Sequence, residues 1–180
     1  MSRQETIGEN QYLAQIVAQF RTAMLVNVSR DGRHRARPLT IANRDANEPA
    51  PAAPGGAQSP QQVSFITSRS NGLVEDLQSE PSICVTMQDG QKFVCLAGTA
   101  RISEDRERLC GLWSSAFDLW FRAGPDDPEV ALIDCNIDFA EYWDGSGIAG
   151  VRLVAEAVRA RASGDTSDPR RMGRHGELDP

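Results

Sequence analysis

Three hydroxyl side chains stand together where the sequence could bind a phosphate or another anion. Thr67, Ser68 and Ser70 follow an apolar, strand-like stretch and come just before a predicted short helix. The turn that opens a helix presents free N–H groups and the positive end of the helix dipole, so it favours an anion. Arg37 and Arg69 could add positive charge and paired donors. The alternative is that the hydroxyls end a strand and the arginines face solvent.

Other residue types give little sign of catalysis or of a metal site. The chain has two histidines, of which His34 lies in a basic hairpin and His175 in a polar tail. Its four cysteines form no C-x-x-C pair, so their spacing indicates no zinc site. We expect Asp126 and Asp127 to form a turn and capping pair rather than to bind a metal. The sequence therefore assigns no metal site, and it names no catalytic side chain.

The composition indicates a soluble protein in a reducing compartment. The chain has 180 residues and a formal net charge of -6, so it has no general electrostatic reason to bind nucleic acid or an anionic membrane. No apolar run approaches the roughly 20 residues that span a bilayer, and the first residues lack the apolar stretch of a signal peptide. Cys84 and Cys95 lie in apolar, strand-like runs and are expected to be buried thiols. We therefore predict a cytoplasmic location.

The hydrophobic pattern predicts antiparallel strands with few helices, which is an α+β class centred on a small barrel or barrel-like sheet. Asp31-Gly32 and Asp89-Gly90 are typical hairpin turns. Pro38 indicates an edge strand or a bulge, and Gly98 indicates a bulge or a close backbone approach. The expected strands are 24–29, 33–43, 63–67, 83–88, 93–103 and one near 138–143; the expected helices are 9–20, 70–78, 105–113 and 148–162.

The chain is expected to form one main domain, residues 1–163, followed by a polar and loosely ordered tail, residues 164–180. Residues 46–62 hold four prolines and a Gly-Gly pair among alanines and glutamines. Such a segment cannot bury a core, and we expect a mobile insertion loop there.

Several stretches, in order and spacing, resemble the general stress protein branch of the pyridoxamine 5'-phosphate oxidase-like flavoproteins. The resemblance covers most of residues 10–180 apart from the proline-rich loop. The stretches are FRTAMLV at 20–26, ARPL at 36–39, FITS at 65–68, LAGTAR at 96–101, LWF at 119–121, GPDDP at 124–128, EYWD at 141–144 and MGRHG at 172–176.

This resemblance implies an FMN-binding split β-barrel, mostly antiparallel and Greek-key-like, with flanking helices. It also implies a homodimer that holds FMN in a cleft between the subunits. The phosphate turn at residues 67–71 predicts that FMN binds in preference to FAD or riboflavin. The ring would lie along residues 37–39, and the ribityl phosphate would reach Thr67 and the turn after it. The cofactor-binding residues that we predict are Arg37, Pro38, Leu39, Ile66, Thr67, Ser68, Arg69, Asn71, Gly72, Leu73 and Trp120.

One departure from the family pattern bears on the phosphate. Many relatives carry a lysine where this chain has Leu73, and losing a charged hydrogen bond could weaken FMN about tenfold to a hundredfold. Arg69 could compensate, and the spacing of Leu73 with Val74 and Leu77 also allows a core position. We therefore expect an FMN-binding, oxidoreductase-like protein whose substrate is open. The alternative is a non-enzymatic dimeric stress or interaction protein with a vestigial flavin cleft.

Overall fold

The computed structural model describes residues 12–42, 62–145 and 174–178, the last of these as backbone only. Its strands form a seven-stranded antiparallel sheet in the order β2-β1-β4-β5-β6-β3, with β7 paired to β6. The sheet curls into a half-barrel, which confirms the predicted split-barrel fold. The strands are β1 Thr22–Val28, β2 His34–Thr40, β3 Gln62–Ser68, β4 Ser82–Asp89, β5 Lys92–Ser103, β6 Val130–Asp144 and β7 Arg174–Leu178.

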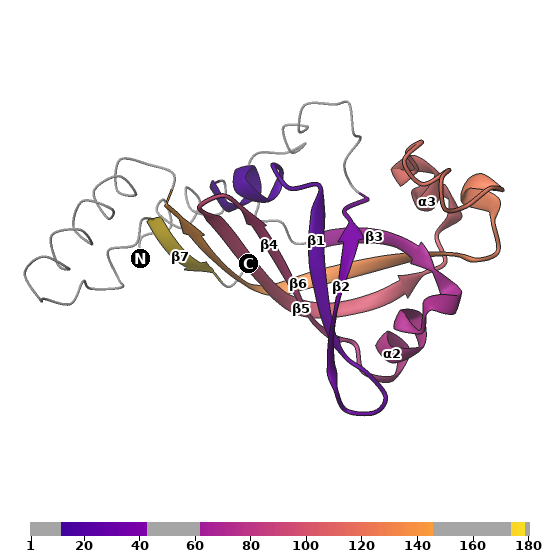
Figure 1. The fold of residues 1–180 in the computed structure, drawn as a ribbon, viewed down its shortest axis with the longest axis horizontal. Helices are drawn as coiled ribbons and strands as arrows, with labels where there is room; N and C mark the ends of the chain where they lie inside the picture. Colours follow the sequence, from indigo (N-terminus) through magenta and orange to yellow (C-terminus); the bar gives the residue numbers. More distant parts are fainter. Residues whose placement is uncertain (1–11, 43–61, 146–173, 179–180) are drawn as a thin grey trace, which may run out of the picture.

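Short helices flank the sheet. Figure 1 shows β5 and β6 running along its length, with α2 and α3 near one end and β7 at the other. These helices are α2 Leu73–Ser79 and α3 Arg106–Leu112, with 3-10 turns η1 Arg69–Asn71 and η2 Gly124–Asp126. Of the helix predicted over 9–20, the described part is helical over 12–17. The helix predicted over 148–162 and the loop over 46–61 lie outside the described residues, whereas Gln62 already begins β3.

Both predicted hairpins are present, with glycines that supply the left-handed conformation in each turn. Gly32 has φ 76° between β1 and β2, and Gly90 has φ 58° between β4 and β5. Pro38 lies in β2 at one edge of the sheet, as predicted. The pairing of β5 with β6 shifts register between Ala97 and Gly98, which confirms the predicted bulge.

Two strands differ from the prediction. β6 extends over 15 residues rather than only near 138–143. Its first half is buried on both faces, so it lacks the alternation that marks a half-exposed strand. Residues 174–178 belong to the tail that we expected to be loose, yet they pair with the last part of β6 as β7. Their short polar sequence has no strand pattern, and β6 supplies the partner. The predicted boundary at 163 lies outside the described residues.

The two cysteines predicted to be buried thiols are only half-buried. Cys84 in β4 and Cys95 in β5 point to the outer face of the sheet, because they alternate with inward-facing neighbours such as Val85 and Leu96. Their sulfur atoms lie 3.3 Å apart. The buried cysteine is Cys135 in β6.

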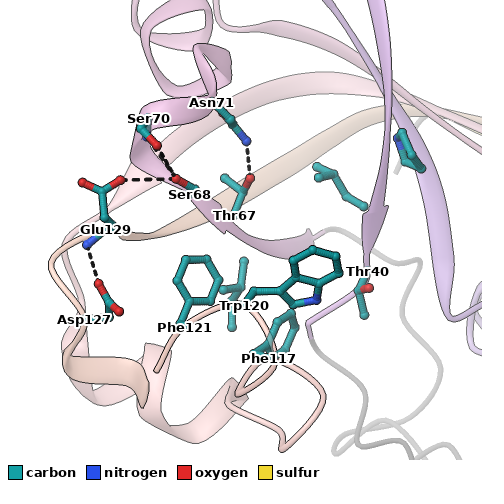
Figure 2. Close-up of a pocket in the computed structure, with 13 residues that line it drawn as sticks. Thr40, Thr67, Ser68, Ser70, Asn71, Phe117, Trp120, Phe121, Asp127 and Glu129 are labelled. Atoms are coloured by element: carbon teal, nitrogen blue, oxygen red, sulfur yellow. Dashed lines mark hydrogen bonds between the residues drawn. The ribbon is translucent and has the colours of Figure 1, made fainter. Parts of the chain in front are cut away.

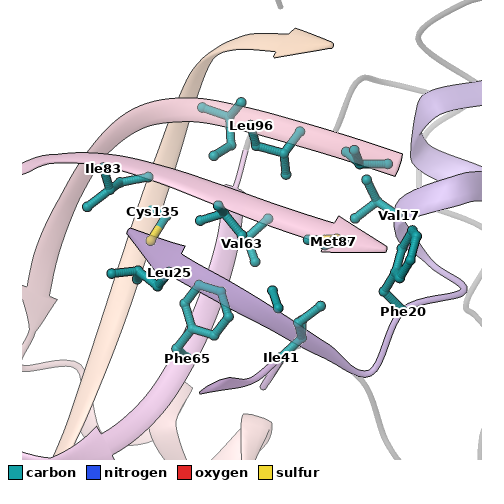
Figure 3. Close-up of a cluster of buried hydrophobic side chains, with 14 of the residues drawn as sticks. Val17, Phe20, Leu25, Ile41, Val63, Phe65, Ile83, Met87, Leu96 and Cys135 are labelled. Carbon is teal, nitrogen blue, oxygen red and sulfur yellow. The ribbon is translucent and has the colours of Figure 1, made fainter. Parts of the chain in front are cut away.

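A continuous core fills the concave side of the sheet. Side chains from five strands and from the N-terminal helix converge there, and those of Leu25, Phe65 and Leu96 are fully buried (Figure 3). A second, smaller cluster lies around Phe117 and Phe121, where the chain between α3 and β6 covers β3 and the start of β6. Together the two clusters fix the walls of the site described next.

In the described part of the chain, the two edges of the half-barrel meet at one point. Ile41 and Phe65 form a single bridge, and the Ala42 N–H donates to the Ser64 carbonyl at 2.8 Å. Beyond this contact the edge strands β2 and β3 separate, and among the described strands β2 pairs with β1 and β3 pairs with β6. Backbone groups on the open sides of both edges therefore face the gap between them.

Candidate functional site

A cavity of about 500 Å³ lies where β2 and β3 separate. Figure 2 shows that its walls come from both edge strands, from the turn after β3 and from the segment before β6. The mouth of a barrel is a common place for a small ligand, and such pockets combine apolar and aromatic walls with a few polar groups. The lining residues are Pro38, Leu39, Thr40, Ile66, Thr67, Ser68, Ser70, Asn71, Phe117, Trp120, Phe121, Asp127 and Glu129.

One wall is aromatic. Phe117 and Phe121 are buried, whereas the Trp120 side chain is 75% exposed beside the cavity. A tight turn holds them, because the Trp120 and Phe121 N–H groups donate to the Phe117 carbonyl at 2.9 and 3.0 Å. Trp113 supports the turn from behind, with ring centroids 5.5 Å from Phe117 and 6.0 Å from Phe121. The result is a fixed apolar surface with one free indole ring.

The facing wall is polar, and its groups already bond to one another. Asn71 donates its side-chain N–H to the Thr67 hydroxyl at 2.5 Å and accepts from the Leu73 N–H at 2.9 Å. The Ser68 hydroxyl accepts from the Ser70 N–H at 3.2 Å and lies 2.8 Å from the Ser70 hydroxyl. Ser68 therefore caps η1 and Asn71 accepts the first N–H of α2, so the donors predicted to receive an anion are largely engaged.

Two carboxylates close the end of the cavity beside this polar turn. Glu129 accepts from the Ser68 hydroxyl at 3.3 Å, and the Arg69 N–H donates to the Glu129 carbonyl at 2.8 Å. Asp127 accepts from the Glu129 N–H at 3.0 Å in an Asx turn, which agrees with the turn role expected of Asp126 and Asp127. No lysine, arginine or histidine lines the cavity within the ranges 12–42 and 62–145.

The two predicted cations point elsewhere. The Arg69 guanidinium donates to the Val130 carbonyl at 3.1 Å and lies 3.5 Å from Glu104. Arg37 donates to the Asn27 side-chain oxygen at 2.6 Å and to Asp76 at 3.2 Å. Neither guanidinium lines the cavity.

Asp76 ties the β1–β2 hairpin to α2. The residue is 6% exposed, and its carboxylate accepts from the Arg30 N–H as well as from Arg37. Burial raises the pKa of Asp76, but the Arg30 N–H, the Arg37 guanidinium and the Asn27 amide outweigh burial and hold the pKa below its usual value. We call this contact of Asp76 with Arg30 and Arg37 the Asp76 clip. It holds the β1–β2 hairpin, which carries residues 38–40, against α2.

Seven of the eleven predicted cofactor residues therefore line one cavity: Pro38, Leu39, Ile66, Thr67, Ser68, Asn71 and Trp120. Arg37, Arg69, Gly72 and Leu73 do not line it. Leu73 is fully buried in the core, where its spacing with Val74 and Leu77 on α2 places it, so it does not face the cavity as the family alignment suggested.

Sequence reasoning missed several wall residues. Phe117 and Phe121 are four residues apart in an aromatic stretch, a spacing that could have paired them. Glu129 carries no such signal, because its position depends on how β6 pairs with β3. Thr40 follows two predicted residues of β2 and could have been included by alternation along the strand.

A split half-barrel with a cavity between its open edges defines the structural class of this protein. The family model described as pyridoxamine 5'-phosphate oxidase like matches residues 8–168. The chain belongs to this family, as the sequence resemblance predicted. No curated protein matches the chain, and in the described residues no helix has the length and apolar character needed to cross a membrane.

Solved structures are similar over most of the chain. A candidate general stress protein 26 from Jannaschia sp. CCS1 has 24% identity and a TM-score of 0.67, covering 96% of this chain and 98% of that one. The general stress FMN/FAD binding protein from Xanthomonas citri has 24% identity and a TM-score of 0.61, covering 78% and 92%. A protein related to general stress protein 26, from Clostridium acetobutylicum, has 18% identity and a TM-score of 0.61, covering 80% and 91%. At these identities the likeness shows the fold.

Proposed function

We propose that this protein binds a flavin in the cavity between β2 and β3 and acts as an oxidoreductase-like flavoprotein. FMN is the flavin that the family resemblance predicts, and the similar Xanthomonas citri protein is an FMN/FAD binding protein. The observation that carries the proposal is the cavity itself, in which an aromatic wall faces a hydroxyl and amide wall between two open sheet edges.

The residues present fit the ring and the ribityl chain. Leu39, Ile66 and Trp120 offer an apolar slot, and the exposed indole of Trp120 can lie against a planar ring. Thr67 and Asn71, which bond to each other, would offer polar groups to the ribityl hydroxyls. When bound, the flavin supplies the redox chemistry, and the protein binds and orients it. The phosphate has hydroxyl and amide neighbours in the described part of the cavity but no cation.

Titration of apo-protein with flavin, followed by quenching of flavin fluorescence, tests the proposal. Trp120→Ala should lower the affinity for flavin about tenfold, because stacking of one ring on an aromatic side chain contributes roughly 1–3 kcal/mol in comparable sites. Trp120→Phe is the matched control, since it keeps an aromatic ring beside the cavity and should bind flavin nearly as tightly as the parent protein. Absence of saturable binding in the parent protein would rule the proposal out.

We further propose that the protein works as a cytoplasmic homodimer with the flavin near the subunit interface. Large apolar side chains are exposed at Met24, Phe93, Leu119 and Trp120, the last beside the cavity. Leu119 and Trp120 are adjacent, and a second copy would cover the exposed apolar surface that they form beside the cavity. Light scattering should give about twice the 19.6 kDa chain mass; a stable, flavin-loaded monomer at micromolar concentration would contradict the dimer. Cell fractionation tests the location.

The second candidate function is a non-enzymatic dimeric stress or interaction protein with a vestigial flavin cleft. The lack of a cavity-lining cation among the described residues favours it. Dimerisation without flavin uptake is its expected signature, and the same titration and light-scattering measurements separate it from the first candidate.

A further inference from the structure

Among the described residues, the polar end of the cavity carries negative rather than positive charge, which does not suit a phosphate. Glu129 lies against Ser68, within the turn where the sequence predicted phosphate binding, and Asp127 adjoins it. A phosphate placed at this turn would carry about two negative charges. It would meet carboxylates where a phosphate site ordinarily presents cations and free N–H groups.

We infer that Asp127 and Glu129 oppose the phosphate of FMN, so that the protein holds its flavin through the ring and ribityl chain as a dissociable ligand. This inference rests on the proposed function and deepens it. It departs from the preference for FMN over riboflavin that the sequence predicts. A flavin held in this way exchanges with free flavin, and the protein would use it as a carried or transient ligand.

The nearby cations are committed to other partners. Arg69 is fixed at its Nε by the Val130 backbone carbonyl, and its other contact is Glu104. Arg37 is only 19% exposed and is held by Asp76 and Asn27. At the position where many relatives carry a lysine, this chain has Leu73, which lies in the core. None of these side chains offsets the two carboxylates at the turn.

The strength of the repulsion between these carboxylates and a phosphate depends on how exposed the carboxylates are. Glu129 is exposed and Asp127 is partly buried, so their repulsion of a phosphate acts through a mostly aqueous medium. A unit charge pair about 4 Å apart in water corresponds to roughly a fivefold change in a binding constant. Two carboxylates facing a dianion should therefore cancel most of what the hydroxyl donors contribute. Because these charges are solvent-accessible, added salt should screen their repulsion.

The test is a titration of the full-length apo-protein with FMN and with riboflavin, at low and at moderate salt. We expect FMN to bind no more tightly than riboflavin at low salt. Added salt should raise the affinity for FMN severalfold and leave the affinity for riboflavin unchanged. The direction of the salt effect distinguishes the two cases, because a cationic phosphate site loses affinity for FMN as salt rises. Desalting should remove the bound flavin.

Variants locate the effect. Glu129→Gln should raise FMN affinity about fivefold, reduce its salt dependence and leave riboflavin affinity unchanged. Glu107→Gln is the control, since it removes the same charge from an exposed position on α3 that does not line the cavity. FMN binding at least tenfold tighter than riboflavin, and weakened by salt, would overturn the inference while leaving the proposed function standing. Failure of both flavins to bind would overturn both.

Discussion

Replacing Asp76 should reveal how strongly the β1–β2 hairpin depends on its clip to α2. In Asp76→Ala the Arg37 guanidinium loses its carboxylate, and the Arg30 N–H loses its acceptor. Hydrogen bonds to charged groups contribute about 1.5–3 kcal/mol each, and breaking a buried ion pair costs about 3–5 kcal/mol. Because the Arg37 side chain keeps 19% exposure and can gain water, we expect a loss of about 2–4 kcal/mol in the free energy of unfolding at pH 7.

The same clip should give the stability a dependence on acid. The pKa of Asp76 is lowered in the folded protein, so its contribution is present above the pKa of an unfolded aspartate, about 3.9. The contribution is lost as the pH falls through the lower, folded value. The difference between parent and Asp76→Asn should therefore be largest near pH 7 and shrink toward pH 3.

Urea unfolding followed by circular dichroism at both pH values measures these differences. Glu75→Gln is the matched control, because Glu75 precedes Asp76 on α2 and pairs with Arg30 at the exposed surface. Surface ion pairs of this kind contribute about 0–1 kcal/mol. If Asp76→Ala costs no more than Glu75→Gln, the clip does not hold the hairpin, and the reasoning is refuted.

Two further predictions concern packing and thiol chemistry. Gly98→Ala should lower the free energy of unfolding by about 3 kcal/mol or more, because its Cβ would lie 1.9 Å from the Asn136 carbonyl oxygen. Gly111→Ala in α3 meets no atom within 4 Å and should raise it by about 0.5–1 kcal/mol; thermal melts that shift both variants in one direction would contradict this. Burial, followed by the neighbouring thiol, raises the pKa of Cys84 to about 12, so at pH 8 iodoacetamide should modify exposed Cys110 much faster. Equal rates by mass spectrometry would refute that expectation.

The fold was predictable where the local signals are strong. Asp31-Gly32 and Asp89-Gly90 each join two alternating strands, and both form the hairpins that their sequences indicate. Gly98 marks the bulge in β5. The first half of β6 and the whole of β7 were not predicted as strands. The first is buried on both faces and the second is short and polar, so neither shows a period of two. Their pairing is decided by partners far along the chain.

The candidate site was predictable in its location and less so in its charges. The stretches at 37–39 and 66–71 do meet at one cavity, because they lie on the two edges of the sheet. The sequence motifs did not show whether each predicted side chain faces the cavity. Arg37 and Arg69 have other acceptors within reach, and Leu73 follows the apolar face of α2 into the core. Glu129 reaches the site only through the register of β6 against β3.

The position of β3 in the sheet affects how the protein is made. β1 pairs with β2, and β4 with β5, through short turns that can close as soon as each pair is synthesised. β3 has its ladder partner in β6, about 60 to 75 residues later. At ribosomal rates of about 5–20 residues per second, this apolar strand waits roughly 3–15 s before its partner exists. A nascent chain therefore exposes the sequence QVSFITS throughout that interval, a period in which chaperone binding competes with aggregation. The strand that forms one wall of the cavity is thus completed late, and under the proposed function flavin uptake would follow the synthesis of β6.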